Sequence, residues 1–170
     1  MVGVDFAQPM LALAQKKATQ YQQQRQKEGG KWVAMKWLCG DVERLALPDG
    51  QFDRACCAFG MRNLQHPRQG LREAFRLLRS GGRLVMLEFF LPRKSLWAGA
   101  YGFYFRLVLP IIGSIMAHDR QGAYHYLPQS VRGFGGAAQL EAMLREAGFR
   151  AVQVEALAGG AVGVFSADKL

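Results

Sequence analysis

Short apolar runs alternate with longer amphipathic stretches along this chain. The runs predict β-strands at residues 2–5, 33–39, 53–59 and 83–89. The run at 53–59 is apolar at every position after its first two, which is too continuous for a sheet with one wet face. That pattern is typical of a strand in a parallel sheet with both faces covered.

The amphipathic stretches predict helices at residues 9–27, 67–79 and 138–149. The pattern at 67–79 is the clearest, because Leu71, Phe75 and Leu78 share one face and arginines occupy the others. Ser80, Gly81 and Gly82 are expected to end that helix, and Gly148 the last one.

The C-terminal stretches 150–157 and 161–167 predict a hairpin around Gly159 and Gly160. Strands that alternate with helices and end in a hairpin predict an α/β fold with a doubly wound, mostly parallel sheet and right-handed crossovers. In such a fold the ligand crevice lies at the carboxyl ends of the parallel strands. No repeat or linker divides the chain, so residues 1–170 are expected to form a single domain.

Residues 92–136 break this alternation with an aromatic, glycine-containing segment. Its stretch 97–117 has about the length of a membrane span. Arg106 lies near the centre of that stretch, and a central charge opposes insertion by about 2.5–3.5 kcal/mol. We therefore interpret it as an apolar surface or lid element that contacts lipid.

The formal net charge of +9 suits nucleic acid, an anionic membrane surface or an anionic ligand without choosing among them. No RNP-like strand supports an RNA-binding module, so no nucleic-acid partner is expected. Cys39, Cys56 and Cys57 are wrongly spaced for a zinc site, so no metal is expected, and we interpret them as buried thiols in a reducing cytosol. The chain begins without a signal-peptide pattern.

Polar residues follow the predicted strands where a ligand would lie. Asp5 ends the first strand, and its two carboxylate oxygens can accept both ribose hydroxyls of a nucleotide; the alternative is a turn or capping Asp for the next helix. Asp41 follows the second strand and can accept a purine amino group; the alternative is an Asx turn. Such residues define a nucleoside site but do not separate NAD from S-adenosylmethionine.

The stretch AFGMRN, residues 58–63, follows the third strand. Gly60 allows a sharp exit or a close backbone approach, and Arg62 and Asn63 are expected at the mouth of the crevice. The alternatives are a surface arginine and an asparagine that starts a helix. His118 and His125 are candidate bases, or else lid and surface histidines.

The specific stretches AFGMRN, RLLRSGGRLVMLEF and AYHYLPQSV carry a resemblance that extends over nearly the whole chain. The sequence resembles the ubiquinone/menaquinone biosynthesis C-methyltransferase family of class I S-adenosylmethionine-dependent methyltransferases. The resemblance implies S-adenosylmethionine as the cofactor, and carbon methylation of a polyprenylated quinol of the demethylmenaquinol or 2-methoxy-6-polyprenyl-1,4-benzoquinol type.

The resemblance also assigns roles to residues. It implies ribose binding by Asp5, adenine contacts by Asp41 and Val42, and a cofactor-lining position for Ala58. It places Arg62 and Asn63 beside the reacting centre as the catalytic pair. Our hypothesis from the chemistry is that Arg62 stabilises a developing phenolate and orients water, with Asn63 positioning it. It makes residues 97–128, within the insertion 92–136, a substrate lid with Tyr124 and Tyr126 as ring or tail contacts.

Location and assembly follow from the resemblance together with the basic charge. We expect a cytoplasmic protein peripherally associated with the inner membrane. A homodimer or a quinone-biosynthesis complex is the expected assembly. A Rossmann dehydrogenase fits AFGMRN and the closing hairpin less well.

The family has an N-terminal helical region and a first strand with a glycine-rich turn before the strand that here ends at Asp5. Neither precedes Met1, so we expect a chain that lacks the family's N-terminal region and exposes strand edges. The competing hypothesis is a non-catalytic homologue that acts as a partner in a membrane-associated quinone-synthesis complex.

Overall fold

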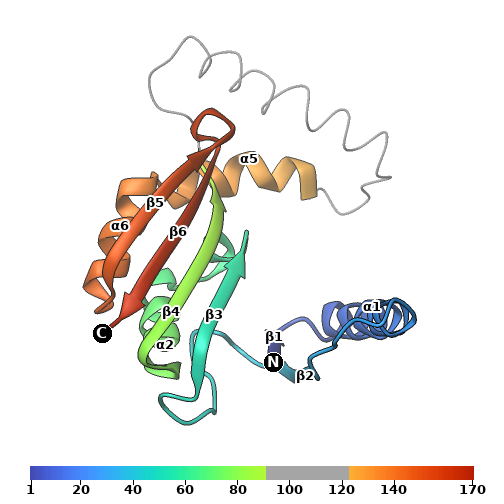
Figure 1. Ribbon diagram of the computed structural model, residues 1–170. Helices are drawn as coiled ribbons and strands as arrows, with labels where there is room; N and C mark the ends of the chain where they lie inside the picture. The colour runs from blue at the N-terminus through green and yellow to red at the C-terminus, as the bar shows by residue number, and fades with distance from the viewer. Residues whose placement is uncertain (91–122) are drawn as a thin grey trace. The chain divides into compact units, whose positions relative to one another are not determined.

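The structure is a computed structural model that describes residues 1–90 and 123–170 (Figure 1). The chain divides into two units, Met1–Leu47 and Pro48–Leu170. The strands form two sheets, one in each unit, and the described elements follow the predicted alternation of strands and helices.

The first unit contains β1 (Val2–Asp5), α1 (Gln8–Lys27) and β2 (Lys36–Cys39). β1 and β2 pair in parallel, with Asp5 opposite Cys39 at their carboxyl ends. α1 begins with Pro9 in its first turn, where a missing N–H does no harm, and Gly29 follows its end in a left-handed conformation. The second strand is shorter than the predicted 33–39.

The second unit is built on a four-stranded sheet in the order β3-β4-β6-β5. β3 (Phe52–Ala58) pairs in parallel with β4 (Leu78–Phe89), whereas β6 (Val162–Lys169) pairs antiparallel with both β4 and β5 (Arg150–Leu157). The short helix η3 (Ala158–Gly160) joins β5 to β6. The predicted parallel strands and closing hairpin are therefore confirmed.

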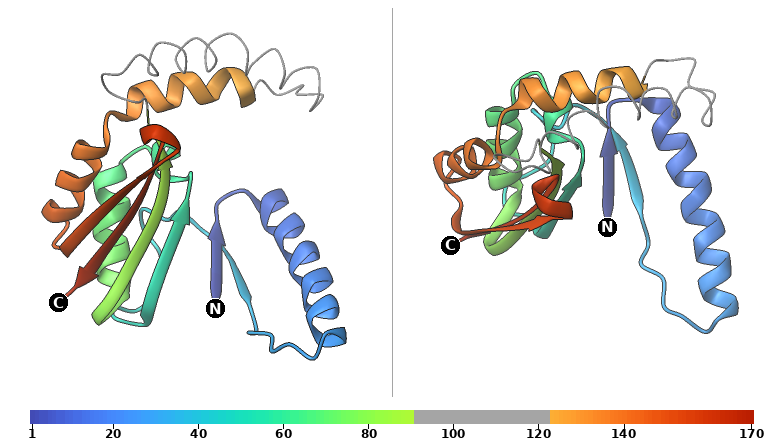
Figure 2. Two further views of the ribbon diagram at one scale, coloured as in Figure 1. Left: turned by 45° about the horizontal axis from the view of Figure 1, so that its top comes forward. Right: turned by 90° about the horizontal axis from the view of Figure 1, so that it is seen from above.

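Helices α2 (Pro67–Leu77) and α6 (Ala137–Glu146) lie on one face of this sheet (Figure 2). They cover the core, to which α2 contributes Leu71 and α6 contributes Leu140 and Leu144. The sheet contributes Leu84, Met86, Phe165 and Ala167. Among the described residues, the remaining helices are the short η1 (Met61–Asn63) and α5 (Ala123–Phe134).

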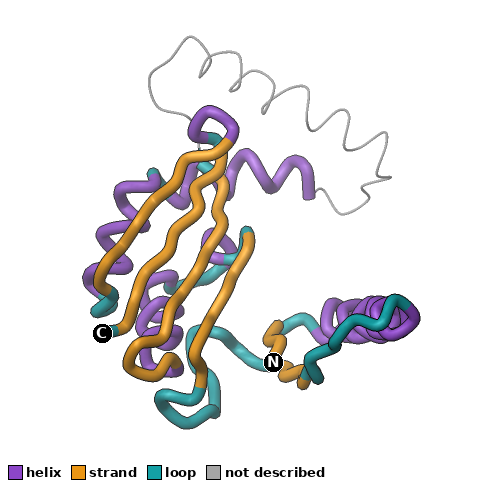
Figure 3. The backbone as a smooth tube through the Cα atoms, in the orientation of Figure 1, coloured by secondary structure: helices purple, strands orange, loops and turns teal. Residues whose placement is uncertain are grey.

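The end of α2 differs from the prediction. The helix ends at Leu77 instead of residue 79, and β4 follows it directly (Figure 3). Leu78 is extended, fully buried and paired with Phe52, whereas the next pair along the strands is Arg54 with Arg83. The pairing and burial of Leu78 stabilise the fold more than one further residue of helix would. The stretch from Leu78 to Gly82 then forms an irregularity in the ladder between β3 and β4.

The prediction of one domain with residues 92–136 as a lid stays a prediction, because residues 91–122 lie outside the described ranges. Among residues 1–90 and 123–170, no helix combines the length and hydropathy that crossing a bilayer requires. The same residues contain no cluster of histidine, cysteine and acidic side chains arranged to hold a metal ion.

Candidate active site

Asp5 ends β1 and Asp41 follows β2, so both lie at the carboxyl ends of the paired strands of the first unit. Gly40 donates its backbone N–H to the carbonyl oxygen of Asp5 at 3.1 Å, which holds the two strand ends together. Oδ1 of Asp5 accepts the N–H of Ala7 at 2.8 Å, and Oδ1 of Asp41 accepts the N–H of Glu43 at 2.9 Å. Both carboxylates therefore make the local turns that were the alternatives to ligand binding.

Turn formation and ligand binding are compatible at these positions. A carboxylate has two oxygens with several acceptor sites, and each turn occupies only Oδ1. Within the part of the chain that the structure describes, Oδ2 of Asp5 and Oδ2 of Asp41 accept no hydrogen bond. Asp41 is exposed, and Asp5 and Val42 are half-buried, so a ligand has access to this edge.

The exit from β3 belongs to the second unit and forms a tight turn. Ala58 is the last residue of β3; it is exposed and pairs with Leu87 of β4. Phe59 takes a left-handed conformation, with φ of 58°, and donates its N–H to the carbonyl oxygen of Leu87. Gly60 instead provides the close approach, since a Cβ there would lie 2.9 Å from Sγ of Cys57.

Arg62 is mostly buried rather than a surface arginine. Its side chain is 10% exposed, and its Nη1 donates to Oε1 of Glu88 at 2.7 Å and to the carbonyl oxygen of Phe59 at 2.6 Å. The guanidinium carbon lies 5.6 Å from the centre of the Phe89 ring. Its Nε is buried and makes no hydrogen bond with the described residues.

Glu88 is the functional candidate that sequence reasoning missed. It is the penultimate residue of β4, and its side chain is wholly buried against Arg62. The signal in the sequence was a carboxylate inside the apolar run RLVMLEF, since buried charges are rare unless paired.

Asn63 ends η1 and is exposed, with its Nδ2 donating to the carbonyl oxygen of Phe59 at 3.4 Å. Tyr124 and Tyr126 lie in α5, but their side chains are outside the described residues. The same holds for His118, for the side chain of His125 and for most of the lid 97–128.

The cysteines correct one expectation. Cys39 and Cys56 are exposed and only Cys57 is half-buried, so the interpretation of all three as buried thiols is wrong. Cys56 and Cys57 point to opposite faces of β3. Within the described residues, the face that carries Cys57 is the one that packs against the core. Burial raises the pKa of the Cys57 thiol, which keeps it protonated and unreactive at neutral pH.

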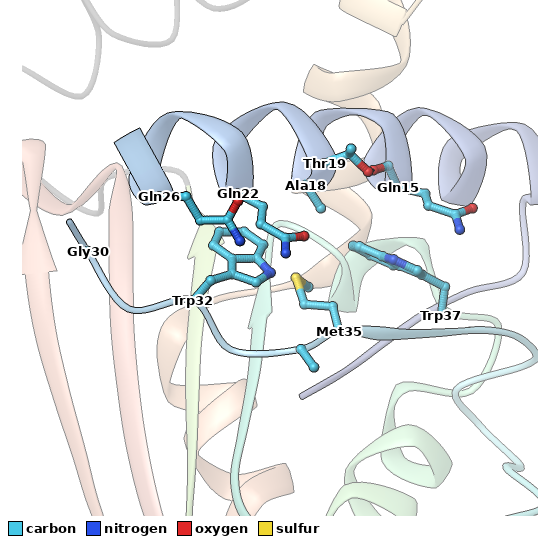
Figure 4. Close-up of a pocket in the computed structure, with 10 residues that line it drawn as sticks. Gln15, Ala18, Thr19, Gln22, Gln26, Gly30, Trp32, Met35 and Trp37 are labelled. Carbon is cyan, nitrogen blue, oxygen red and sulfur yellow. The ribbon is translucent and has the colours of Figure 1, made fainter. Parts of the chain in front are cut away.

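Pockets of the described residues lie elsewhere. A pocket of about 490 Å³ in the first unit lies between α1 and the segment before β2, where Gln22 and Gln26 face Trp32 and Met35 (Figure 4). A pocket of about 380 Å³ in the second unit is lined by the start of α2 and by residues of α5 and α6. None of the predicted site residues lines either pocket.

The chain matches the family model described as the ubiE/COQ5 methyltransferase family over residues 1–169. This chain belongs to that family. Its sequence is 42% identical over 169 residues to the demethylmenaquinone methyltransferase of Deinococcus radiodurans, covering 99% of this chain and 65% of the relative. It is 39% identical to the protein of the same name from Thermus thermophilus, covering 99% of this chain and 71% of the relative.

Eukaryotic relatives are similar over a smaller share of their length. The mitochondrial 2-methoxy-6-polyprenyl-1,4-benzoquinol methylase of Danio rerio is 40% identical over 147 residues, covering 86% of this chain and 45% of the relative. The chain thus spans about two thirds of its bacterial relatives and about half of this eukaryotic one.

Solved structures confirm the class I methyltransferase fold. A SAM-dependent methyltransferase from Aquifex aeolicus superposes with a TM-score of 0.62 at 18% identity, covering 99% of this chain and 68% of that one. The [4+2]-cyclase SpnF superposes with a TM-score of 0.66 at 20% identity, covering 99% of this chain and 66% of that one. A cyclase with this fold shows that the fold alone does not give the reaction.

Proposed function

We propose that this protein transfers a methyl group from S-adenosylmethionine to a ring carbon of a polyprenylated quinol in menaquinone or ubiquinone biosynthesis. The observation that carries the proposal is the family match over residues 1–169, which includes AFGMRN at the carboxyl end of β3. The names of the relatives, demethylmenaquinone methyltransferase and 2-methoxy-6-polyprenyl-1,4-benzoquinol methylase, support this class of substrate.

The carboxylates at the strand ends of the first unit can accept hydrogen bonds from the hydroxyl and amino groups of a nucleoside. Oδ2 of Asp5 would accept a ribose hydroxyl, and Oδ2 of Asp41 would accept the adenine amino group beside Val42. Ala58, small and exposed at the end of β3, is proposed as a further cofactor-lining residue. When bound, S-adenosylmethionine supplies an electrophilic methyl on a sulfonium, so that the protein's task is mainly to align donor and acceptor.

Arg62 and Asn63 are the proposed catalytic pair. The acceptor carbon becomes nucleophilic when a neighbouring quinol hydroxyl loses its proton, which places negative charge on that oxygen. An arginine side chain cannot easily act as the base, but the buried Nε–H of Arg62 can donate to the oxygen as the charge develops. Asn63 and Arg62 both donate to the carbonyl oxygen of Phe59, so Asn63 would help to fix the turn that positions Arg62.

A membrane surface is the proposed source of the substrate. The net charge of +9 favours an anionic bilayer, and the apolar stretch 97–117 favours contact with an isoprenoid tail. Tyr124 and Tyr126 are proposed contacts of the ring or tail. A cytoplasmic protein held peripherally at the inner membrane, as a homodimer or in a quinone-biosynthesis complex, would have access to such a substrate.

Methyl transfer tests the proposal directly. The purified protein is incubated with methyl-labelled S-adenosylmethionine and, in separate reactions, with a reduced demethylmenaquinol and a reduced 2-methoxy-6-polyprenyl-1,4-benzoquinol in detergent. We expect label in the extracted quinol and a large loss of transfer in Arg62→Ala. A folded protein that transfers no label to either quinol and binds no S-adenosylhomocysteine would instead favour the non-catalytic partner, which keeps the basic surface but not the cofactor site.

A further inference from the structure

Glu88 occupies a position that the sheet would ordinarily fill with an apolar side chain. Along β4, Leu84, Met86 and Glu88 alternate onto the face that carries the core, and buried Phe90 continues the row. Of these side chains only Glu88 carries a charge, and none of its surface is exposed. Such a charge is retained in a buried position only with strong partners.

The Glu88 carboxylate accepts three hydrogen bonds. Oε2 accepts the backbone N–H of Arg62 at 3.2 Å, and Oε1 accepts Nη1 of Arg62 at 2.7 Å and the backbone N–H of Phe89 at 2.9 Å. The carboxylate therefore binds both the backbone and the side chain of Arg62. It fixes η1 to the carboxyl end of β4, 26 residues later in the chain.

Stability alone does not account for this pair. Replacing a buried ion pair with well-packed apolar side chains is often neutral or stabilising, because desolvation offsets the attraction between the charges. The neighbouring Met86 shows that this face accommodates an apolar chain of similar length. What the pair does provide is a single orientation of the guanidinium, since Nη1 is held by two acceptors at once.

Two further features indicate that this orientation serves a ligand. Nε of Arg62 is buried without a partner among the described residues, which is unfavourable unless an acceptor arrives. Phe59, whose carbonyl oxygen accepts Nη1, has a φ of 58° and stacks on Phe89 with ring centres 4.3 Å apart. Strained residues of this kind persist where the surroundings hold them, as they do around binding sites.

We propose that Glu88 is a positioning residue, whose buried carboxylate holds Arg62 with Nε–H directed at the oxygen of the methyl acceptor. This inference rests on the proposed function. Because Glu88 neutralises the pair, Arg62 acts on the acceptor through one aligned N–H rather than through net positive charge. Glu88 itself touches neither the acceptor nor the cofactor.

Kinetics of Glu88→Gln, Arg62→Met and the double variant Arg62→Met/Glu88→Met test the coupling. In Glu88→Gln we expect kcat to fall about 10- to 100-fold, with the KM of S-adenosylmethionine changed by less than about threefold. In the Arg62→Met background, the further change Glu88→Met should alter kcat by less than about twofold, because Glu88 acts only through Arg62. The double variant leaves no unpaired buried charge, so it should fold.

The matched control is Glu73→Gln, which removes another largely buried carboxylate paired with an arginine, Arg76 on α2. Its kcat should stay within about twofold of the unchanged protein if the effect of Glu88 is local. A fall in kcat as large as that of Glu88→Gln would show a general loss of structure and overturn the proposal.

An NMR readout separates this inference from the proposed function. The Nε–H resonance of Arg62, assigned by its loss in Arg62→Met, should exchange slowly with water in the unchanged protein and in Glu73→Gln. It should broaden in Glu88→Gln. A protein that shows this behaviour but methylates no quinol would refute the proposed function alone. An Nε–H signal that Glu88→Gln leaves unchanged, or a wild-type kcat in that variant, would overturn the positioning role.

Discussion

Arg83 on β4 and Asp168 on β6 form a two-point ion pair across the sheet. Nε of Arg83 lies 2.6 Å from Oδ1 of Asp168, and Nη2 lies 2.8 Å from Oδ2. The two residues are opposite each other in the antiparallel register. The hydrogen bonds from Arg83 hold the pKa of Asp168 below its usual range, so the pair links the stability of the central strands to pH.

Stability should fall with acidity through this pair. A carboxyl whose folded pKa is depressed contributes stability that is present above its unfolded pKa, about 3.9, and lost as pH falls through the folded value. Urea unfolding should therefore show Asp168→Asn to be less stable than the unchanged protein at pH 5.5, with the gap closing towards pH 3. Glu155→Gln, at an exposed position of β5, should show no gap. A gap of equal size at both pH values would contradict the linkage.

Lys169 should stabilise the junction between α2 and β4. Its Nζ donates to the carbonyl oxygen of Phe75 in the last turn of α2, at 2.8 Å, and to that of Leu78 at the start of β4, at 2.7 Å. Lys169→Met keeps an apolar stem but removes both donors, so the free energy of unfolding should fall by about 1–3 kcal/mol. Lys16→Met, at an exposed position of α1, should change it by less than about 0.5 kcal/mol. Equal effects would refute the capping role.

Gly148 should resist substitution where Gly133 does not. Gly148 has a φ of 106°, and a Cβ there would approach Cζ of Phe75 to 3.0 Å. Gly148→Ala should therefore destabilise the protein by about 1–3 kcal/mol in denaturant unfolding. No described residue lies within 4 Å of where a Cβ of Gly133 in α5 would be, so Gly133→Ala should stabilise by up to about 1 kcal/mol. A Gly148→Ala protein as stable as Gly133→Ala would contradict the strain.

Asp5 allows its turn role to be separated from its proposed ligand role. Asp5→Asn keeps a side-chain oxygen for the N–H of Ala7, whereas Asp5→Ala removes it. If Asp5 binds ribose hydroxyls through its charge, both variants should lose about tenfold or more in affinity for S-adenosylhomocysteine by calorimetry. Loss in Asp5→Ala alone would assign the residue to the turn.

The sequence predicted the elements whose signals are local. Strand and helix periodicities, with Gly148 and the Gly159–Gly160 turn as boundaries, were sufficient for the order of elements and for the closing hairpin. The end of α2 could not be predicted in this way, because Leu78 leaves the helix to pair with Phe52, a partner distant in sequence. The exposure of Cys56 depends likewise on what packs against β3.

The same distinction applies to the candidate site. Asp5, Asp41 and Arg62 could be selected as strand-end residues, since the carboxyl ends of strands are where such folds bind ligands. Their hydrogen bonds could not, because Arg62 follows β3 and its partner Glu88 lies near the end of β4, 26 residues later. The left-handed conformation of Phe59 could not be predicted either, because residues other than glycine rarely adopt it.

The most direct test of the central claim is calorimetric binding of S-adenosylhomocysteine to the purified protein, with folding checked by circular dichroism on the same sample. The account predicts a saturable heat with one ligand bound per chain. A folded protein that gives no binding heat at several temperatures would contradict the assignment of S-adenosylmethionine as its cofactor, and the proposed methyl transfer with it.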